Sequence, residues 1–575
     1  MRSMRIGLLA DSDSCAAGSE ARVWSERLVR GLAPHEFHVF DLAADGAGRS
    51  GGAPCAVPDA EGPSVPGSAH PRPYRPSYQS ARQPAYRPSY RLGRRERRSF
   101  LDHFGLLVGA AGDAVGGTDP GGADFAEGLY GLALLARDHG PLTDALRSDP
   151  AVRVIESLCR TPGARGAHGL GPTGLTDHLA LAAGLAGLLA PLSLPWYEGN
   201  GLGAVDLCHA ATGGPAALPG VLAKRFFGIP LLVTEYGVHL RAHYLSGAHA
   251  GADRPSAPVR ALLAAARRLL AAEIYGAAAL VVSGDRAGRR WQERCGTDPA
   301  KLRTVHPGLD PEPFTAVGDG GCPGDPYTVV WRGPFTPAED LVALLHAFAR
   351  VRAAEPRARL RLFGESAPDD KEAKEAAEAR AHCRALAAHL FPDEAADDRT
   401  AGENPVSFEE LGGPEAPGAA DAYAMGRVVA LTGAVDGFPT GLAEAMLCGR
   451  ATVATDAGGA AEVVGGTGLV VPPRNPRALA DACLTLLGDP ERAHRLGAVA
   501  RDRALELFTV DQNLTAFHGI YLELISRSPV RREALDDAGT PLPFAHPAEA
   551  RVPLTALTST AAPRPGFPFR QETPR

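Results

Sequence analysis

The feature that most constrains the fold of this chain is a regular alternation of short apolar runs with longer helical segments, in two series. The apolar runs of the first series are MRIGLLAD, FHVFDLAAD, VDLCHAA, IPLLVTEYG, ALVVSGD and LRTVHPGLD. Those of the second series are YTVVWRG, ARLRLFGE, RVVALTGAV, ATVATDAG and GLVVPP. Because such alternation builds a parallel sheet with helices on both faces, the sequence predicts two doubly wound α/β domains.

The length of the chain agrees with two domains, since 575 residues are too many for one ordinary hydrophobic core. We expect an N-terminal Rossmann-like domain over residues 1–305, a C-terminal one over 306–527 and a disordered tail over 528–575. Ligands of doubly wound sheets bind at the carboxyl ends of the strands. Two facing domains would therefore place these ends around one central cleft, with space for two substrates.

Two segments depart from the alternation. Residues 46–98 are rich in Gly, Pro, Ser, Arg and Tyr and contain RPSY twice, so we predict a disordered insertion there. Its arginines and tyrosines could contact RNA, acidic lipid or an acidic protein face, but a solvated loop explains the same composition. Residues 366–420 are acidic and Ala-rich and predict a variable insertion of helix and loop.

Residues 100–200 predict helices, because their apolar positions recur at helical spacing. The longest uncharged stretch of the chain, LALAAGLAGLLAPLSLPWY at 179–197, lies among them. It is short for a membrane span, rich in Gly and Ala, and interrupted by Pro191. We therefore predict a helix packed in or on the protein rather than a membrane segment.

The overall composition limits the partners and the compartment. A formal net charge of −7 argues against a chain that tracks nucleic acid or coats a membrane. The nine cysteines are scattered without a CxxC pair, which is typical of a reducing cytosol and not of a disulfide framework or a zinc site. The start, MRSMRIGLLADSDSC, has too short an apolar core for a signal peptide and predicts a first strand. A cytoplasmic location is expected.

The turn VDGFPTG follows the predicted strand RVVALTGAV and so lies at the ligand-binding edge of the second sheet. We expect Thr440 to cap a helix that begins at Gly441, which leaves backbone N–H groups for an anion such as a diphosphate. Glu444 in the first turn and Asp436 before it could accept hydrogen bonds from the hydroxyls of a ribose and a sugar. The turn would then hold a nucleotide sugar. By itself the pair of acids is a weak signal, because an acid early in a helix is favourable in any case.

The surrounding motifs make the signal stronger. The order of strand, DGFP-x-G, EAM, strand, TDAGG-xx-E and VVPP resembles the nucleotide-sugar-binding domain of the retaining family 4 glycosyltransferases, which have the GT-B fold. The flanking segments DLVALLHAFARVRAAEPRARLRLFG and PPRNPRALADACLTLLGDPERAHRLG are similar to that domain as well. In the N-terminal half, VDLCHAATGGPAALPGVLAKRFFGIPLLVTEYGVHLRAHYLS looks like the bacterial glycosyltransferases related to the one that polymerises the Pel exopolysaccharide.

The resemblance implies roles for residues around the turn. Glu444 would hold the ribose, and Asp436 would hold the transferred sugar together with the amides of Gly437 and Phe438. The family usually has Glu at the position of Asp436. An Asp keeps the negative charge, but its side chain is one methylene shorter. The donor-binding turn is completed by Pro439, Thr440 and Gly441.

The diphosphate site follows the family pattern in part. By resemblance, Gly18 would let the first loop approach the diphosphate, and Arg332 would grip it with its planar fork. An ordinary surface cation is the alternative interpretation of Arg332. The family normally has a lysine shortly after that arginine, but GPFTPAEDL places Glu339 or its neighbours there. Loss of one charge-assisted contact to phosphate could cost ~1.5–3 kcal/mol.

The catalytic candidates lie in the first domain. Relatives in the Pel-like branch commonly have Glu-His-Gly where this chain has Glu235 and Tyr236 before a glycine. A basic group there would neutralise the leaving phosphate or orient the acceptor. His209, His239 and Arg241 are therefore the basic candidates, and Glu235 is a further catalytic candidate. His209 is either a site residue or a buried structural histidine.

By resemblance, the chain is a hexosyltransferase that moves a sugar with retention from a UDP- or GDP-linked donor to a glycan, glycolipid or small-molecule acceptor. It needs no metal or other cofactor, because positioning and electrostatic stabilisation of the departing diphosphate drive the reaction. The missing lysine and Tyr236 leave a second interpretation open, a catalytically impaired homologue that binds a nucleotide sugar or a partner enzyme. A dinucleotide-dependent enzyme is disfavoured, because GNGLGA precedes a strand instead of following one.

The expected partners follow from the glycosyltransferase interpretation. They are a nucleotide sugar and a glycan or lipid-linked acceptor, with no nucleic acid. An exopolysaccharide or glycolipid acceptor would bring the protein to the inner membrane face through a peripheral contact with lipid or a membrane protein.

Overall fold

The computed structural model describes most of the chain up to Ser528. The described ranges are 3–11, 20–42, 77–80, 92–116, 122–160, 173–193, 201–238, 240–241, 244, 255–321, 324–365, 370–391, 404–433 and 437–528. These residues belong to one compact unit, Met1–Ser528. The predicted tail beyond Ser528 lies outside the described residues.

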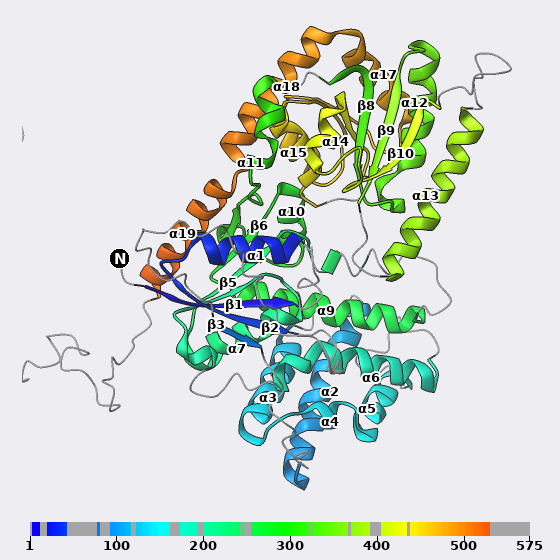
Figure 1. The fold of residues 1–575 in the computed structure, drawn as a ribbon. Helices are drawn as coiled ribbons and strands as arrows, with labels where there is room; N and C mark the ends of the chain where they lie inside the picture. The colour runs from blue at the N-terminus through cyan, green and yellow to red at the C-terminus, as the bar shows by residue number, and fades with distance from the viewer. Residues whose placement is uncertain are drawn as a thin grey trace, which may run out of the picture. The chain divides into compact units, whose positions relative to one another are not determined.

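The first lobe is built on a seven-stranded parallel sheet (Figure 1). In sheet order, its strands are β3 (Ser77–Ser80), β2 (Glu36–Leu42), β1 (Arg5–Asp11), β4 (Leu207–Ala210), β5 (Leu231–Glu235), β6 (Leu280–Ser283) and β7 (Leu302–Thr304). The helices that connect them include α1 (Glu20–Gly31), α7 (Leu218–Phe227), α9 (Ala257–Ala277) and α10 (Arg286–Arg294). The central strands β4, β5 and β6 are buried along their whole length, as their continuous apolar runs require. The predicted α/β class is confirmed.

A helical layer interrupts the strand series of this lobe, as predicted for residues 100–200. Its helices are α2 (Arg94–Gly116), α3 (Gly122–His139), α4 (Thr143–Leu146), α5 (Asp149–Arg160) and α6 (Leu175–Leu189). Helices α2 and α3 pack closely because α3 presents glycines to its neighbour. A Cβ on Gly128 would lie 2.6 Å from the carbonyl oxygen of His103, a contact that no side chain could make.

The apolar stretch predicted as a packed helix is α6 with the short turn that follows it. In the described part of the chain, Leu175–Ser193 is the one helical stretch with the length and composition to cross a membrane, and half of it is buried inside the fold. Leu181 and Leu185 are fully buried, and α6 packs against α5 and α9. These contacts agree with a helix packed on the protein.

The prediction of disorder over 46–98 is wrong for two short pieces of that segment. Ser77–Ser80 form the edge strand β3, parallel to β2, and helix α2 begins at Arg94. An edge strand needs ladder hydrogen bonds on one side only, so four polar residues suffice and leave little apolar signal in the sequence. The greater part of the segment lies outside the described residues.

The second lobe is built on a six-stranded parallel sheet. In sheet order, its strands are β10 (Val406–Glu410), β9 (Arg359–Gly364), β8 (Asp325–Gly333), β11 (Gly426–Leu431), β12 (Ala451–Thr455) and β13 (Leu469–Val471). Its helices are α11 (Glu312–Ala316), α12 (Leu341–Ala354), α13 (Asp370–Leu390), α14 (Ala419–Ala424), α15 (Thr440–Leu447), α16 (Ala460–Val464), α17 (Pro476–Gly488) and α18 (Pro490–Leu507).

The prediction of a helix-and-loop insertion over 366–420 missed a strand. This segment supplies α13 and then β10, which pairs with β9 as the edge of the second sheet. The strand VSFEE carries two acids because Glu409 pairs with Arg361 of β9 at 2.7 Å and Glu410 pairs with Arg380 of α13 at 2.5 Å. The segment is thus a regular helix–strand unit of the domain.

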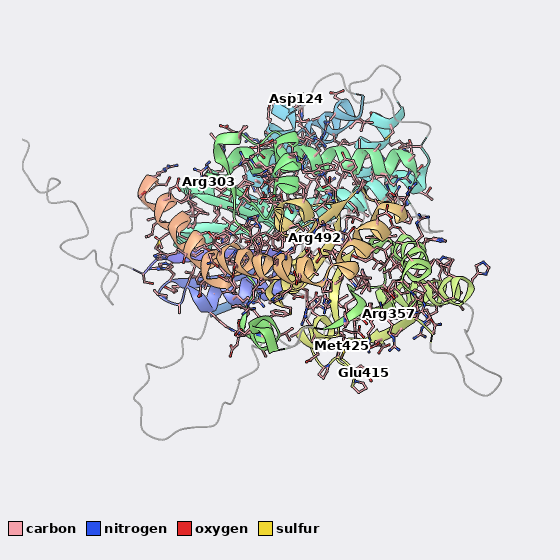
Figure 2. All side chains as sticks on the ribbon, turned by 90° about the horizontal axis from the view of Figure 1, so that it is seen from above. Asp124, Arg303, Arg357, Glu415, Met425 and Arg492 are labelled. Atoms are coloured by element: carbon pink, nitrogen blue, oxygen red, sulfur yellow. The ribbon has the colours of Figure 1, made fainter. Side chains whose placement is uncertain are left out.

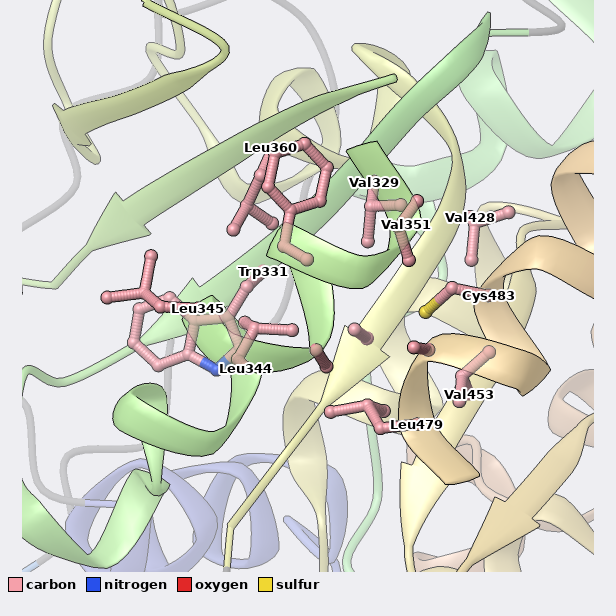
Figure 3. Packing of buried hydrophobic residues seen from close by; sticks show 14 of the residues in the cluster. Val329, Trp331, Leu344, Leu345, Val351, Leu360, Val428, Val453, Leu479 and Cys483 are labelled. Atoms are coloured by element: carbon pink, nitrogen blue, oxygen red, sulfur yellow. The ribbon is translucent and has the colours of Figure 1, made fainter. Parts of the chain in front are cut away.

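Side chains alternate along β8 between two buried clusters. Val329 and Trp331 point into the cluster shared with α12 and α17, where Leu344 and Leu479 lie (Figure 3). Val330 points to the opposite face, into the cluster that contains α15. Side chains two positions apart lie on the same face of a strand, so Arg332 points to the same side as Val330, toward α14 and α15 at the carboxyl end of β8.

The last helix, α19 (Val510–Arg527), follows the second sheet in sequence but packs on the first lobe. Fully buried Phe517 and Tyr521 of α19 join the cluster formed by α1, β1 and β4. The Tyr521 hydroxyl shares a hydrogen bond of 2.8 Å with His209 Nδ1 on β4. Near the end of the helix, Glu523 pairs with Arg303 of β7 at 3.9 Å (Arg303 is labelled in Figure 2).

We predict that Tyr521→Phe lowers the free energy of unfolding by about 1–3 kcal/mol, because it leaves a buried ring nitrogen of His209 without its partner. The matched control is Thr515→Ala on the exposed side of α19, which should change it by less than about 0.5 kcal/mol. Urea unfolding followed by circular dichroism measures both. Equal stability of the two variants would contradict the role given to this hydrogen bond.

Candidate functional site

The carboxyl edge of the second sheet gathers Arg332, Glu365 and Glu444 into one cluster. Arg332 is the penultimate residue of β8, and Glu365 directly follows β9, which pairs with β8 at that point. Glu444 comes from the second turn of α15. The Arg332 guanidinium bonds Glu444 through Nη1 and pairs with Glu365 through Nη2 at 3.0 Å. Two residues predicted to share a donor site, Arg332 and Glu444, are thus in direct contact.

Tyr423 of α14 completes this cluster. Its hydroxyl donates to the Gly441 carbonyl at 2.9 Å and lies 3.2 Å from both Arg332 Nη1 and Glu444 Oε2. Tyr423 is therefore a functional candidate that the sequence analysis missed, since nothing in its local sequence marks it. Glu365 was also missed, although its place directly after a strand was a usable signal.

Burial and charge set the protonation state of the cluster. The side chains of Arg332 and Glu444 are 14% and 13% exposed. Burial alone would lower the pKa of the Arg332 guanidinium, but Tyr423, Glu444 and Glu365 outweigh it and the net shift is upward. Arg332 is therefore permanently charged, and its Nε is buried without a hydrogen-bond partner among the described residues.

The turn before α15 differs from the prediction at Thr440. Thr440 is the first residue of α15, and its side chain makes no capping bond; Pro439 takes the N-cap position. The Pro439 carbonyl accepts from the N–H groups of Leu442 and Ala443 at 3.0 and 3.2 Å. In the described part of the chain, the N–H groups of Gly437, Phe438 and Gly441 donate to no backbone carbonyl. The cap thus differs from the prediction, and the binding of an anion by these N–H groups stays a prediction.

The turn is held by its aromatic residue and by a backbone bond. The Phe438 ring packs 5.7 Å from His306 and 5.6 Å from Phe508, measured between ring centres. The Gly437 carbonyl accepts from the N–H of Gly459 at 3.0 Å. Phe438 thus anchors the turn with its side chain and leaves only its backbone for a ligand.

Two predicted donor residues, Gly18 and Asp436, lie outside the described residues. Their roles remain predictions.

The position where the family 4 resemblance implies a lysine is occupied by acids. Glu339 ends a short turn, and its carbonyl accepts from the Thr432 hydroxyl at 2.6 Å, next to the end of β11. Asp340 follows in a left-handed conformation with φ of 49°. Burial raises the pKa of its carboxyl group, although the Ala343 N–H and the charge of Arg474 oppose the shift. Arg474, from the loop after β13, places a cation near the Asp340 carboxylate.

His209 does not line a site, which corrects its prediction as a catalytic residue. It is fully buried on β4, and its Nε2 bonds the Thr234 hydroxyl at 2.8 Å while its Nδ1 bonds Tyr521. Burial lowers the pKa of the His209 imidazole to about 3. It is a neutral structural histidine that joins β4 and β5 to α19.

Glu235 is also a buried structural group, contrary to its prediction as a catalytic residue. It is 1% exposed at the end of β5. Its carboxylate accepts from the Gly213 N–H at 2.9 Å, from the Tyr275 hydroxyl and from Gln292 Nε2 at 3.4 Å. These bonds fix the loop after β4 and the helices α9 and α10.

Tyr236, at the position where the Pel-like resemblance implies a histidine, joins the first lobe to α19 and lies near the turn at 437–441. Its hydroxyl accepts from Asn513 Nδ2 at 2.9 Å. Its carbonyl lies so near Gly437 that a Cβ there would be 3.2 Å from the oxygen. Burial raises the pKa of this phenol, so Tyr236 stays neutral. Unlike a histidine, a phenol cannot carry a positive charge.

Arg241 is the predicted catalytic residue that does line a cavity. The cavity measures about 150 Å³ and is bordered by Arg241, by α10 and by Gly458 of the second lobe. The residues that α10 contributes were missed, because their helix reads as an ordinary amphipathic segment. The cavity lies beside the turn at 437–441, since Gly459 bonds Gly437.

Comparison with known families identifies the segment that contains this cluster. Residues 326–489 match the family model described as glycosyl transferases group 1. The match lies within the second lobe, and this segment is similar to the group 1 glycosyl transferases. Residues 184–300, in the first lobe, match a model described only as a domain of unknown function (DUF3492).

Curated relatives of the group 1 domain are named as glycosyltransferases. The chain is 28% identical over 315 residues to the D-inositol 3-phosphate glycosyltransferase of Streptomyces bingchenggensis, covering 53% of this chain and 64% of the relative. It is 31% identical over 244 residues to the enzyme of the same name from Kineococcus radiotolerans, covering 39% and 52%. The chain thus spans between about half and two thirds of the length of these relatives.

A solved structure supports the fold around the group 1 domain. Sucrose-phosphate synthase from Thermosynechococcus elongatus superposes with a TM-score of 0.51 at 17% identity, covering 91% of this chain and all of that one. The likeness extends over both lobes, and the fold is the predicted GT-B fold of two Rossmann-like domains. The Pel-like branch and the retaining family 4 remain predictions.

We predict that acid destabilises the protein partly through His209. Its pKa is lowered by burial from 6.5 to about 3, so the unfolded chain takes up this proton first as the pH falls. The stability due to the neutral ring is present above the unfolded pKa and is lost below it, by at most about 1.4 kcal/mol per pH unit. Between about pH 7 and pH 5, the unfolding free energy of wild type should therefore fall more steeply than that of His209→Gln.

The control for this experiment is His346→Gln, which removes an exposed histidine of α12 and should keep the wild-type slope. Urea unfolding at a series of pH values measures the three slopes. Parallel slopes for wild type and His209→Gln would show that His209 does not titrate as its burial requires.

Proposed function

We propose that the protein is a glycosyltransferase that uses a nucleotide-sugar donor bound at the carboxyl edge of the second sheet. The observation that carries this proposal is the contact of Arg332 with Glu444 beside the turn at 437–441, within the group 1 glycosyl transferase domain. The family resemblance implies donor binding for both residues. Their meeting at one sheet edge supports a shared ligand.

The donor would lie along α15. Its diphosphate would meet the N–H groups at the start of α15 and one edge of Arg332, and its ribose would meet Glu444. The transferred sugar would lie at Gly437 and Phe438, on the side toward the first lobe. Stabilisation of negative charge by the guanidinium and the helix terminus is the catalytic contribution that this arrangement can supply.

Several finer points belong to the same proposal. The transfer retains the anomeric configuration, uses a UDP- or GDP-linked hexose and needs no metal or cofactor, as the family 4 resemblance implies. The acceptor is a glycan, a glycolipid or a small molecule, and the protein works in the cytoplasm or peripherally at the inner membrane face.

A specific observation favours a second candidate function, a homologue that binds a nucleotide sugar or a partner enzyme without efficient transfer. Arg332 faces two carboxylates, Glu444 and Glu365, and acids replace the lysine at Glu339 and Asp340. A diphosphate must displace at least part of this ion pairing before Arg332 can bind it. Turnover therefore separates the two candidates, while binding does not.

We predict that UDP or GDP binds the full-length protein with one-to-one stoichiometry and that Glu444→Gln weakens binding about tenfold or more, because a charged acceptor of the ribose hydroxyls is lost. Isothermal titration calorimetry measures the change. The control is Glu409→Gln, which neutralises a similarly buried acid of the second lobe, one that pairs with Arg361 away from the turn. Equal weakening in both variants, or no binding of either nucleotide, would contradict the donor site.

We predict that wild type hydrolyses a nucleotide sugar slowly and that Arg332→Gln reduces kcat by about tenfold or more, because one charge-assisted contact to the leaving diphosphate is lost. Release of UDP or GDP from a panel of nucleotide sugars measures the rate, and Arg361→Gln serves as the matched control on β9. Binding of the nucleotide without any turnover would favour the impaired homologue.

A further inference from the structure

The cavity between α10 and Gly458 is lined by an unusual concentration of positive charge. Arg290, Trp291 and Arg294 of α10 border it together with Arg241 and with Gly458 of the second lobe. Three of its lining side chains are guanidinium groups, although the chain as a whole carries a net charge of −7. The volume of about 150 Å³ admits a phosphate- or carboxylate-bearing group.

The two arginines of α10 are held in place without being neutralised. Arg290 Nε donates to the Arg286 carbonyl at 3.3 Å, and the Arg294 guanidinium lies 6.0 Å from the centre of the Trp291 ring. In the described part of the chain, neither arginine forms an ion pair with a carboxylate. Arg289, one residue away, lies outside the cavity lining and pairs with Glu293 at 3.1 Å. The charges of these two arginines are therefore available to a ligand, whereas Arg241 lies close enough to the Asp285 carboxylate to oppose the rise of its pKa.

The helix that carries these arginines is rigidly fixed. Asp285 caps its first turn by accepting from the Gly288 N–H at 2.7 Å, and burial raises the pKa of this carboxyl group. Gln292 is fully buried and donates toward the Val282 carbonyl at 3.4 Å. At the start of the helix, the Arg286 N–H donates to Glu462 of the second lobe at 2.7 Å. The arginines are thus presented from a preformed surface.

The position of the cavity relates it to the sugar end of the donor and not to the diphosphate end. Gly458 adjoins Gly459, whose N–H bonds the carbonyl of Gly437, the residue proposed to touch the transferred sugar. Arg332 contacts Glu444 in the second turn of α15, further along that helix. An acceptor must approach the transferred sugar, so the cavity is where an acceptor would lie.

We propose that Arg241, Arg290 and Arg294 form a binding site for an anionic group of the acceptor, a phosphate ester or a carboxylate. Arginine suits both groups because its planar fork donates two parallel hydrogen bonds. This inference rests on the proposed glycosyltransferase function, since it names the acceptor class of the same reaction. It assigns α10 a role in substrate selection.

The test uses the full-length protein with UDP added to fill the donor site. Inorganic phosphate, glucose 6-phosphate, glucuronate and glucose are titrated by calorimetry into wild type, into the double variant Arg290→Gln/Arg294→Gln and into Arg289→Gln. Both arginines of the double variant are exposed, and glutamine is a good helix former, so the fold should persist. Circular dichroism and UDP binding verify that each variant is folded.

We expect phosphate and glucose 6-phosphate to bind wild type alongside UDP, with much weaker binding of glucose. The double variant should bind the phosphates about tenfold or more weakly, and Arg289→Gln should bind them as wild type does. Binding of glucuronate at similar strength would identify a general anion site, and its absence would identify a phosphate site.

Several results would overturn the proposal. These are no saturable phosphate binding by wild type, equal binding by the double variant, or competition between phosphate and UDP, which would assign the arginines to the donor. Arginine-dependent phosphate binding by a protein that binds neither UDP nor GDP would instead overturn the proposed function and leave the anion site standing.

Discussion

Every strand pair in both sheets is parallel, and this constraint determines where the functional groups of the protein meet. Parallel strands all end at the same edge, so residues that follow β8, β9 and β11 come together although they are far apart in the sequence. Arg332 and Glu365 are neighbours because β8 and β9 pair in register up to Gly333 and Gly364. The helix after β11 then brings Glu444 to the same edge.

Inside the first lobe, buried polar side chains at the strand ends hold the neighbouring loops and helices in place. Glu235 ties Gly213, Tyr275 and Gln292 together, and Gln292 belongs to the helix that lines the arginine cavity. His209 ties β4 to α19, which itself follows the second sheet. The Glu235 carboxylate and both ring nitrogens of His209 are hydrogen-bonded in the interior, which is the condition under which a buried polar group adds order and does not weaken the fold. Gln292 Oε1 is buried without a hydrogen-bond partner among the described residues.

The two candidate binding surfaces have opposite charge balance. At the donor edge, two carboxylates face Arg332, so a diphosphate must compete for the guanidinium. At the cavity, Arg241, Arg290 and Arg294 line one space. In the proposed reaction, the cavity arginines hold an anionic group of the acceptor, while Arg332 and the N–H groups of the turn meet the diphosphate. The two lobes approach closely between these surfaces, since a Cβ on Gly437 would lie 3.2 Å from the Tyr236 carbonyl oxygen.

The sequence by itself determined the two α/β domains and most of their strands, and it placed Arg332 and Glu444 at the same edge of the second sheet. Periodicity and strand-end position are local properties, and a parallel sheet turns them directly into spatial neighbours, as for Arg332 and Glu444. The sequence could not decide whether His209 and Glu235 face a ligand or the core, because both outcomes place a polar residue at the end of an apolar strand. Only tertiary packing decided that, by covering β4 and β5 with α19 and α9. Tertiary packing also decided that Tyr423 joins the cluster of Arg332 and Glu444, and that the arginines of α10 line the cavity. Their neighbours come from distant elements, whose approach no local sequence pattern encodes.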